Sequence, residues 1–160
     1  MKRIFSIISV LTLAVSGSAL AEKPVTRSQL PQQARNFLAS HYSKTGIAYA
    51  TVDSEMFDAT YDVSLEDGTR LEFTKKGDWT EIKSPRGGSV PASAVPSKIR
   101  AYIERNYPKA TVSRMEIEGR DCNVELSNGV EITFNRQMEM VRSSDMNKHR
   151  PDHRFTLREN

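Results

Sequence analysis

The sequence predicts an α+β fold in which two amphipathic helices pack on one face of antiparallel β-sheet. A nine-residue segment occurs in two similar copies, LEDGTRLEF at residues 65–73 and LSNGVEITF at residues 126–134. Each copy alternates apolar and polar residues around Asp-Gly or Asn-Gly. These pairs favour a type I′ hairpin turn, because both of its central residues need positive φ. A helical pattern precedes each copy, so we expect two tandem modules, each with one helix and four antiparallel strands.

Each predicted helix begins at a proline, which favours the first helical position. After Pro31 the apolar residues are spaced so that they share one helical face, and the same spacing recurs after Pro96. Pro108 ends the second helix, because proline disfavours helical geometry in the residue before it. Repetition of helix and hairpin in the same order indicates a duplicated module. The two apolar faces consist of Ala34, Phe37, Leu38 and Tyr42, and of Ile99, Tyr102, Ile103 and Tyr107.

Strand-like runs follow each helix. Along them apolar residues alternate with polar ones, which is typical of antiparallel sheet packed on one side only. The amphipathic helices are expected to cover the apolar side. The predicted strands span residues 47–52, 57–65, 69–75 and 79–83 in the first half, and 111–117, 121–126, 130–135 and 138–142 in the second.

Composition and spacing also predict how the chain is divided. Each module is small, so we expect the two to fold as a unit, with either continuous or separate sheets. The segment between them is rich in Pro, Gly and Ser and is interpreted as a turn, with a flexible tether as the alternative. The expected parts are a signal peptide (1–21), an N-terminal lead (22–29), a first repeat (30–83), a linker (84–94), a second repeat (95–142) and a mobile C-terminal tail (143–160).

The first residues have the pattern of an export signal. Lys2 and Arg3 form a basic start, residues 4–15 an apolar middle, and residues 19–21 an A-x-A cleavage site. The apolar run is too short to span a bilayer stably. We therefore predict a cut after Ala21, a periplasmic or secreted protein, and no stable membrane span after cleavage.

The net charge argues against a nucleic-acid-binding domain, and the cysteine content argues against a disulfide-stabilised fold. The formal net charge of +3 includes Lys2 and Arg3, and residues 1–21 contain no acid, so the mature chain is close to +1 (3 minus 2). Nucleic-acid-binding domains carry a much larger basic excess. Cys122 is the only cysteine, so the chain has no internal disulfide framework. Its alternation with Val124 and Leu126 predicts a buried thiol, with intermolecular pairing as the alternative.

The sequence contains no recognisable catalytic constellation. A serine-hydrolase elbow, a phosphate loop and a dinucleotide fingerprint are all missing. His149 and His153 have metal-ligand spacing, but Pro151 lies between them and breaks the helix that such a pair needs. His41 has no Ser, Cys or Asp partner in a recognisable arrangement, and a His at a helix end is favourable through the helix dipole alone. We predict no catalytic residue, no metal site and no cofactor, and we expect that the protein is not an enzyme.

The polar face of the sheet is the candidate binding surface. A longer hairpin at residues 53–60, with Met56 at its tip, is a second candidate contact. The alternatives are a solvated face with cross-strand ion pairs, and loop residues that continue the core strand. The predicted partner-binding residues are Asp62, Arg70, Glu72, Asn123, Glu125, Glu131 and Met56.

Five segments carry a family resemblance over residues 30–142. They are LPQQARNFLASHY (30–42), LEDGTRLEF, KGDW (76–79), GGSVPASAVPSKIRAYIERNYPKATV (87–112) and LSNGVEITF. Together they resemble the PepSY-like, β-lactamase-inhibitor-like family of exported bacterial proteins. The resemblance implies tandem α/β modules that form a sheet with helices on one face, export to the periplasm, and no cofactor. It carries over no inhibitory residue, and the 53–60 loop and the C-terminal tail exceed the family pattern.

These observations lead to two functional hypotheses of different classes. The first is a non-catalytic periplasmic binding module that acts through the polar sheet face, with a protein of the cell envelope as its partner. That partner would be a protease or other envelope enzyme that the module inhibits. The alternative is an envelope protein that binds or senses a small molecule or a metal.

Overall fold

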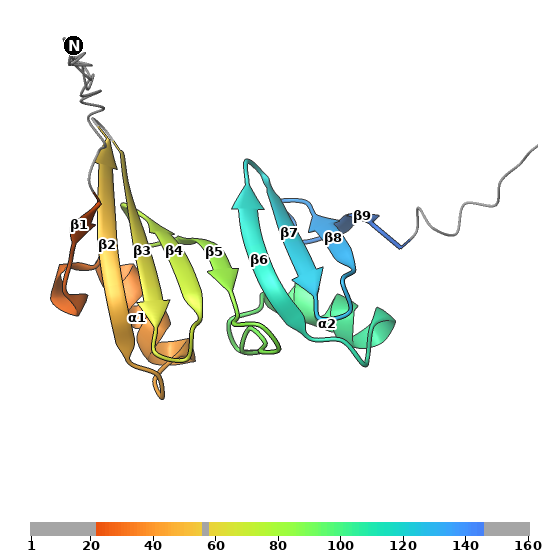
Figure 1. Cartoon of the computed structure of the whole chain (residues 1–160). Helices are drawn as coiled ribbons and strands as arrows, with labels where there is room; N and C mark the ends of the chain where they lie inside the picture. Colours follow the sequence, from red (N-terminus) through yellow and green to blue (C-terminus); the bar gives the residue numbers. More distant parts are fainter. Residues whose placement is uncertain (1–21, 56–57, 146–160) are drawn as a thin grey trace, which may run out of the picture.

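The computed structural model, which describes residues 22–55 and 58–145, contains one continuous antiparallel sheet of nine strands (Figure 1). The strands follow one another in chain order from β1 to β9, and the two α-helices lie behind the sheet. The predicted fold class of two helix-plus-four-strand modules is therefore wrong. β5 pairs with β6 through Glu81, Ile82 and Lys83, and a two-residue strand adds to the outer edge of β2. Pairing β5 with β6 removes two exposed strand edges, which isolated modules would leave open.

The elements have the following bounds. The first half contains β1 (Lys23–Pro24), the 3₁₀-helix η1 (Arg27–Gln29), α1 (Gln32–His41), β2 (Ile47–Glu55), β3 (Asp58–Leu65), β4 (Arg70–Thr74) and β5 (Trp79–Lys83). The second half contains α2 (Ser97–Asn106), β6 (Val112–Glu118), β7 (Asp121–Leu126), β8 (Glu131–Phe134) and β9 (Met140–Ser143).

Both helices end where their sequences predict, and both begin one residue after the proline that was predicted as the first helical residue. Pro31 and Pro96 are the N-cap residues, with φ of −52° and −51°. Tyr42 and Tyr107 are the C-cap residues, and their backbone N–H groups donate to carbonyl groups four residues earlier. Proline therefore starts each helix because its fixed φ suits the entry to the first turn.

The two repeated segments, residues 65–73 and 126–134, form hairpins, but their turns differ from the predicted type I′. Gly68 and Gly129 have φ of 88° and 80°, whereas Asp67 and Asn128 do not have positive φ. The carboxylate of Asp67 accepts a hydrogen bond from the backbone N–H of Thr69 at 2.8 Å. Only the glycine adopts the left-handed conformation, which is typical of a three-residue loop that ends in a bulge.

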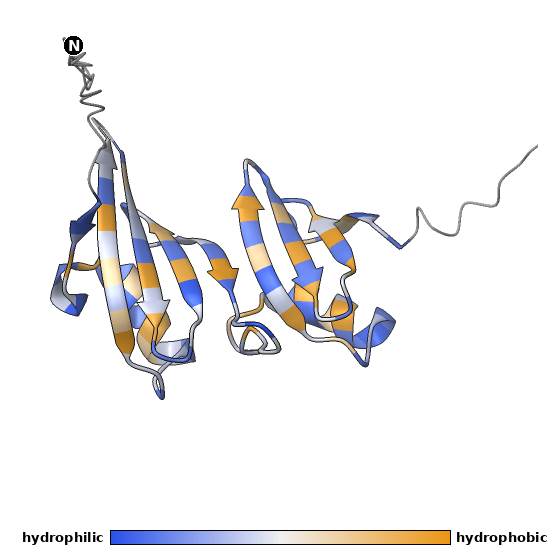
Figure 2. Cartoon of the chain, in the orientation of Figure 1, coloured by the Kyte–Doolittle hydropathy of each residue, from blue (hydrophilic) through white to orange (hydrophobic). Residues whose placement is uncertain are grey.

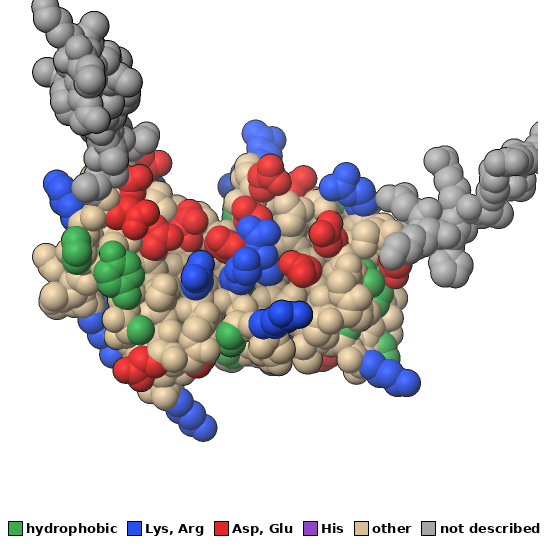
Figure 3. All heavy atoms as spheres, viewed as in Figure 1, with side chains coloured by type: hydrophobic (Ala, Val, Ile, Leu, Met, Phe, Trp, Pro, Cys, Tyr) green, Lys and Arg blue, Asp and Glu red, His purple; other side chains and the backbone are tan. Residues whose placement is uncertain are grey.

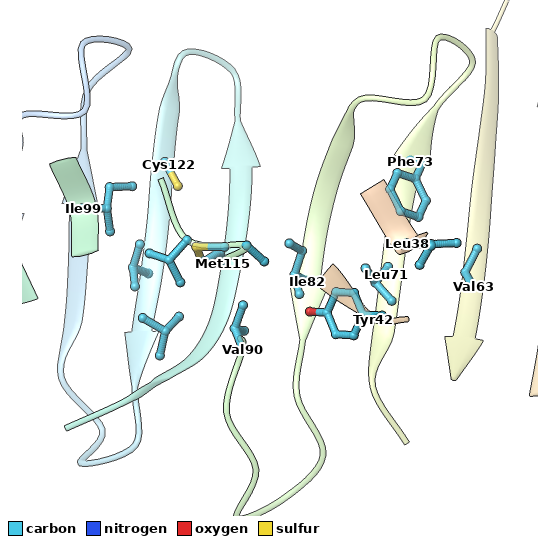
Figure 4. Packing of buried hydrophobic residues seen from close by; sticks show 14 of the residues in the cluster. Leu38, Tyr42, Val63, Leu71, Phe73, Ile82, Val90, Ile99, Met115 and Cys122 are labelled. Atoms are coloured by element: carbon cyan, nitrogen blue, oxygen red, sulfur yellow. The ribbon is translucent and has the colours of Figure 1, made fainter. Parts of the chain in front are cut away.

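One hydrophobic core lies between the sheet and the helices and extends through both halves. Apolar and polar residues alternate along the strands (Figure 2). Ile82 of β5 pairs with Met115 of β6, and both side chains are fully buried (Figure 4). The segment that connects the halves contributes Val90, whose N–H donates to the Val112 carbonyl at 2.8 Å. The segment at residues 84–94 is therefore anchored to the core through Val90 and Ala94, while much of the rest of it is exposed.

Cys122 is a buried free thiol, as its place in the alternation predicts. Burial raises the pKa of this thiol to about 11, so it stays protonated at neutral pH. Within the described residues, no helix is long and apolar enough to cross a membrane. The predicted signal peptide (1–21), Met56, and the two histidines of the C-terminal tail lie outside the described residues.

Candidate functional site

The face of the sheet opposite the helices, which we call the open face, carries many charged side chains (Figure 3). Side chains alternate along a strand, so residues next to buried ones project from this face. Leu71 is buried, for example, and its neighbours Arg70 and Glu72 point to the opposite side. Figure 3 shows acidic side chains gathered over one part of the open face and basic ones near its middle.

The strand register sorts the central charges into two rows that run across the sheet. In one row each acidic residue lies directly opposite the next acidic residue on the neighbouring strand. We call this the acid row, and it consists of Asp62, Glu72, Glu81 and Glu116. Two residues further along the strands lies the basic row, which consists of Arg70, Lys83 and Arg114. Directly opposed like charges destabilise a sheet, so both rows oppose folding.

Arg114 relieves part of this repulsion. Its guanidinium lies 2.5 Å from the Glu81 carboxylate on β5 and 2.8 Å from the Glu116 carboxylate on its own strand. Arg114 therefore bridges β5 and β6 at the point where the two halves of the sheet meet. This bridge confirms that cross-strand ion pairs occur on the open face, the alternative that the sequence left open.

The outer part of the acid row lies next to further carboxylates. Glu72 accepts a hydrogen bond from the Thr80 hydroxyl at 3.0 Å, and Glu22 accepts one from the Thr51 hydroxyl at 3.3 Å. The pKa of Asp62 is raised, first by burial and then by nearby carboxylates, of which Glu72 contributes most. Glu22, Glu81 and Asp53 also raise this pKa, so several carboxylates lie close together at this end of the face.

A shallow hollow of about 470 Å³ lies over β6 to β9 on the open face. It brings together three of the predicted residues, Asn123, Glu125 and Glu131, with Arg114 and Arg142. The Asn123 amide is held on both sides, because its oxygen accepts from Thr133 at 2.9 Å and its nitrogen donates to Glu118 at 3.1 Å. Acidic and basic side chains therefore line the hollow together with an amide that hydrogen bonds hold in place.

The other predicted residues are distributed as follows. Asp62, Arg70 and Glu72 lie on the same open face but over the first half of the sheet, outside the hollow. Met56 lies outside the described residues. Sequence reasoning missed four residues of the two rows and one exposed aromatic side chain on β2. These are Glu81, Lys83, Arg114, Glu116 and Tyr49, the last of which is 54% exposed.

A signal for the missed charges was present in the sequence. The segments Glu81–Lys83 and Arg114–Glu116 each place an acid and a base two positions apart around an apolar residue. Such spacing puts both charges on one face of a strand. Their alignment into rows could not be read from the sequence, because it depends on β5 pairing with β6.

His41 does have a serine neighbour in the fold. Its Nδ1 lies 3.1 Å from the Ser93 hydroxyl, and its ring packs on Phe37 with centroids 4.5 Å apart. Within residues 22–55 and 58–145, no carboxylate bonds to the other ring nitrogen of His41. The pair therefore lacks the orienting acid of a catalytic triad. In the same described ranges, no group of three or more His, Cys, Asp or Glu residues is arranged to hold a metal ion.

Comparison with known proteins identifies similar sequences and structures. The sequence model of a family described as "Putative beta-lactamase-inhibitor-like, PepSY-like" matches residues 59–142. A crystal structure described as a putative periplasmic protein from Bacteroides vulgatus is 38% identical and has a TM-score of 0.72. It covers 78% of this chain and 98% of its own. No curated protein matches the sequence.

Two further crystal structures are comparably similar. One, described as a putative calcium-regulated periplasmic protein from Bacteroides thetaiotaomicron, is 34% identical with a TM-score of 0.71 and covers 76% of this chain and 95% of its own. Another, described as a putative periplasmic protein of unknown function from Bacteroides vulgatus, is 31% identical with a TM-score of 0.70. It covers 78% of this chain and 100% of its own.

Proposed function

Because this chain belongs to the PepSY-like, beta-lactamase-inhibitor-like family, we propose that it is a non-catalytic binding module whose open sheet face contacts a protein of the cell envelope. The family's description as inhibitor-like favours a partner that is itself an enzyme, such as an envelope protease. Export to the periplasm is part of the proposal. It is supported by the signal pattern at residues 1–21 and by the periplasmic descriptions of the similar structures.

The arrangement of charge on the open face carries the proposal. A surface selected for stability alone would place opposite charges on neighbouring strands, since an opposite-charge pair contributes about 0.2–1 kcal/mol whereas directly opposed like charges are destabilising. Here the acid row places like charges opposite one another at three successive strand pairings. Local features that oppose stability are expected at functional sites, where another requirement outweighs them.

The experiment that tests this proposal compares two charge-reversed variants as baits against a periplasmic extract. The first reverses four charges of the open face, through Arg70→Glu, Glu72→Lys, Glu125→Lys and Glu131→Lys. We expect the wild-type chain to retain one abundant protein and this variant to lose it, because the partner must match the charges of the face. Far-UV circular dichroism of the two chains should coincide.

The matched control reverses charges on the helical side of the molecule, through Glu104→Lys and Arg105→Glu on the exposed surface of α2. This control should retain the partner as well as the wild type does. Retention by the open-face variant, or equal loss in the control, would show that the open face is not the binding surface. An activity assay on the captured protein then decides whether binding inhibits it.

A second candidate function is calcium binding on the same face, and one observation favours it. A similar structure is described as calcium-regulated. Although no group of three or more His, Cys, Asp or Glu in the described residues is arranged to hold a metal ion, Asp62 and Glu72 lie opposite each other at the acidic end of the open face and could supply two of the ligands. Carboxylate oxygens are the ligands that calcium prefers. If calcium binds there, millimolar calcium should raise the melting temperature, and Glu72→Gln should abolish the increase while magnesium has less effect. An unchanged melting temperature would exclude this candidate.

A further inference from the structure

Three neighbouring central strands carry the same pair of charges on the open face. On each of β4, β5 and β6 one glutamate and one basic residue lie two positions apart, on either side of a buried residue. The antiparallel register then aligns the glutamates in one row and the basic residues in the next. The pairs are Arg70 with Glu72, Lys83 with Glu81, and Arg114 with Glu116.

This pattern is complementary to itself. We propose that a second copy of this chain binds to the open face, related by a twofold axis that lies between the two rows and runs perpendicular to the strands. Such an axis reverses the strand direction and places the acid row of each copy over the basic row of the other. Glu72 then faces Arg70 of the second copy, and symmetry repeats every contact. Like charges that repel within one sheet are thereby paired between two.

The flanking strands fit the same arrangement. On β3 the axis places Asp62 over Ser64 of the second copy, and on β7 it places Asn123 over Glu125. On β8 it places Thr133 over Glu131. Each of these is a carboxylate facing a hydroxyl or an amide. The Ser64 hydroxyl and the second N–H of the Asn123 amide can donate to the facing carboxylate, whereas the Thr133 O–H already donates to Asn123. No two like charges from these two rows meet between the copies.

The size of the face is sufficient for a specific but reversible dimer. Strands lie about 4.8 Å apart, so β2 to β9 span roughly 34 Å. With about 20 Å along the strands this gives on the order of 700 Å² per copy, near the ~800 Å² that standard interfaces bury on each side. Exposed ion pairs contribute little each and are screened by salt, so we expect a weak and salt-sensitive dimer.

The dimer does not rest on the function proposed above. It covers the same face, so a second copy and a different protein partner would compete for that surface. Loss of dimerisation with retained capture of a partner, or the reverse, would therefore separate the two proposals.

The first experiment is sedimentation equilibrium of the chain from Glu22 to Asn160 over a range of concentrations, at low and at high salt. The expected result is a dimer that forms with rising concentration at low salt and dissociates at high salt. A chain that is monomeric at every concentration in low salt would overturn the proposal. A dimer that is insensitive to salt would overturn it too. This measurement needs no variant, so it does not depend on any substitution folding.

The second experiment exchanges the charges of the two rows. The acid-row variant is Glu72→Lys with Glu81→Lys, and the basic-row variant is Arg70→Glu with Lys83→Glu. Each alone should dimerise at least tenfold more weakly than the wild type, because its two rows then carry the same sign on β4 and β5. An equimolar mixture should regain dimerisation as a heterodimer, because one copy is then basic where the other is acidic.

The control for this exchange is Glu104→Lys with Arg105→Glu on α2, which should dimerise as the wild type does. Circular dichroism establishes that each variant is folded. If a reversed variant fails to fold, the neutral variant Arg70→Gln with Glu72→Gln takes its place and should weaken the dimer. Reversed or neutral variants that dimerise like the wild type, or folded variants whose mixture stays monomeric, would overturn the proposed arrangement.

Discussion

Replacement of Ile82 by alanine is expected to lower the free energy of unfolding of the whole chain by about 2–5 kcal/mol. Ile82 is fully buried and pairs with Leu71 on one side and with Met115 on the other, so it packs where the two halves of the sheet join. Removal of its side chain leaves a cavity in the shared core. The loss should appear as a single shifted transition in urea, because one core extends through both halves.

Two probes make this test specific. Trp79 is the only tryptophan and packs against the core from β5, so its fluorescence reports the first half, whereas far-UV circular dichroism reports the whole chain. The two transitions should coincide. Val141→Ala is the matched control, because Val141 is 60% exposed and its truncation should change stability by less than about 0.5 kcal/mol. If circular dichroism retained a second transition at the wild-type midpoint, the halves would be unfolding independently.

Replacement of Gly77 by alanine is expected to cost about 2–4 kcal/mol, more than the same change at another left-handed glycine. Gly77 has φ of 90° in the turn between β4 and β5, and an added Cβ would lie 2.7 Å from the backbone nitrogen of Ala34. The alanine would therefore both strain the turn and push it away from α1. Asp78, the next residue, accepts a hydrogen bond from the Gln33 side chain, and this contact should weaken as well.

Gly119 provides the control for this prediction. It also has positive φ, at 62°, but an added Cβ would meet nothing within 4 Å. Gly119→Ala should therefore cost only the left-handed backbone strain, about 1–2 kcal/mol. Urea denaturation of both variants measures the difference. Equal losses would mean that contact between the turn and α1 does not explain the glycine at position 77.

The two helix-ending tyrosines show how tertiary structure distinguishes similar sequence patterns. The Tyr107 hydroxyl bonds with the Ser143 hydroxyl at 3.1 Å and with the Asp145 carboxylate at 2.8 Å. The Tyr42 hydroxyl is buried and has no hydrogen-bond partner within the described residues, and burial raises its pKa. Ser143 and Ile82 occupy equivalent positions in the two halves, since Ser143 pairs with Ile132 and Ile82 pairs with Leu71. The serine offers a hydroxyl to Tyr107, whereas the isoleucine has no polar group to offer Tyr42.

The candidate site was predictable only in part. Alternation along single strands was enough to place Asp62, Arg70 and Glu72 on the open face, because the side-chain period of a strand is a local property. The acid row additionally required knowledge of which strands are neighbours. Glu81 and Glu116 are 35 positions apart in the chain (116 minus 81), and only the pairing of β5 with β6 brings them together.

The sequence by itself determined where the helices begin and end to within one residue, where the hairpins turn, which face of most strands is apolar, and that Cys122 is a core thiol. These features follow from propensity and periodicity, which act over a few neighbouring residues. Only the tertiary structure decided that the chain forms one nine-stranded sheet and that its charges form opposed rows. The physical reason is that an exposed strand edge can pair with any other edge. Whether β5 pairs with β6 to give one sheet, or the halves form two separate sheets, therefore depends on packing across the whole core. Local sequence patterns do not predict that packing.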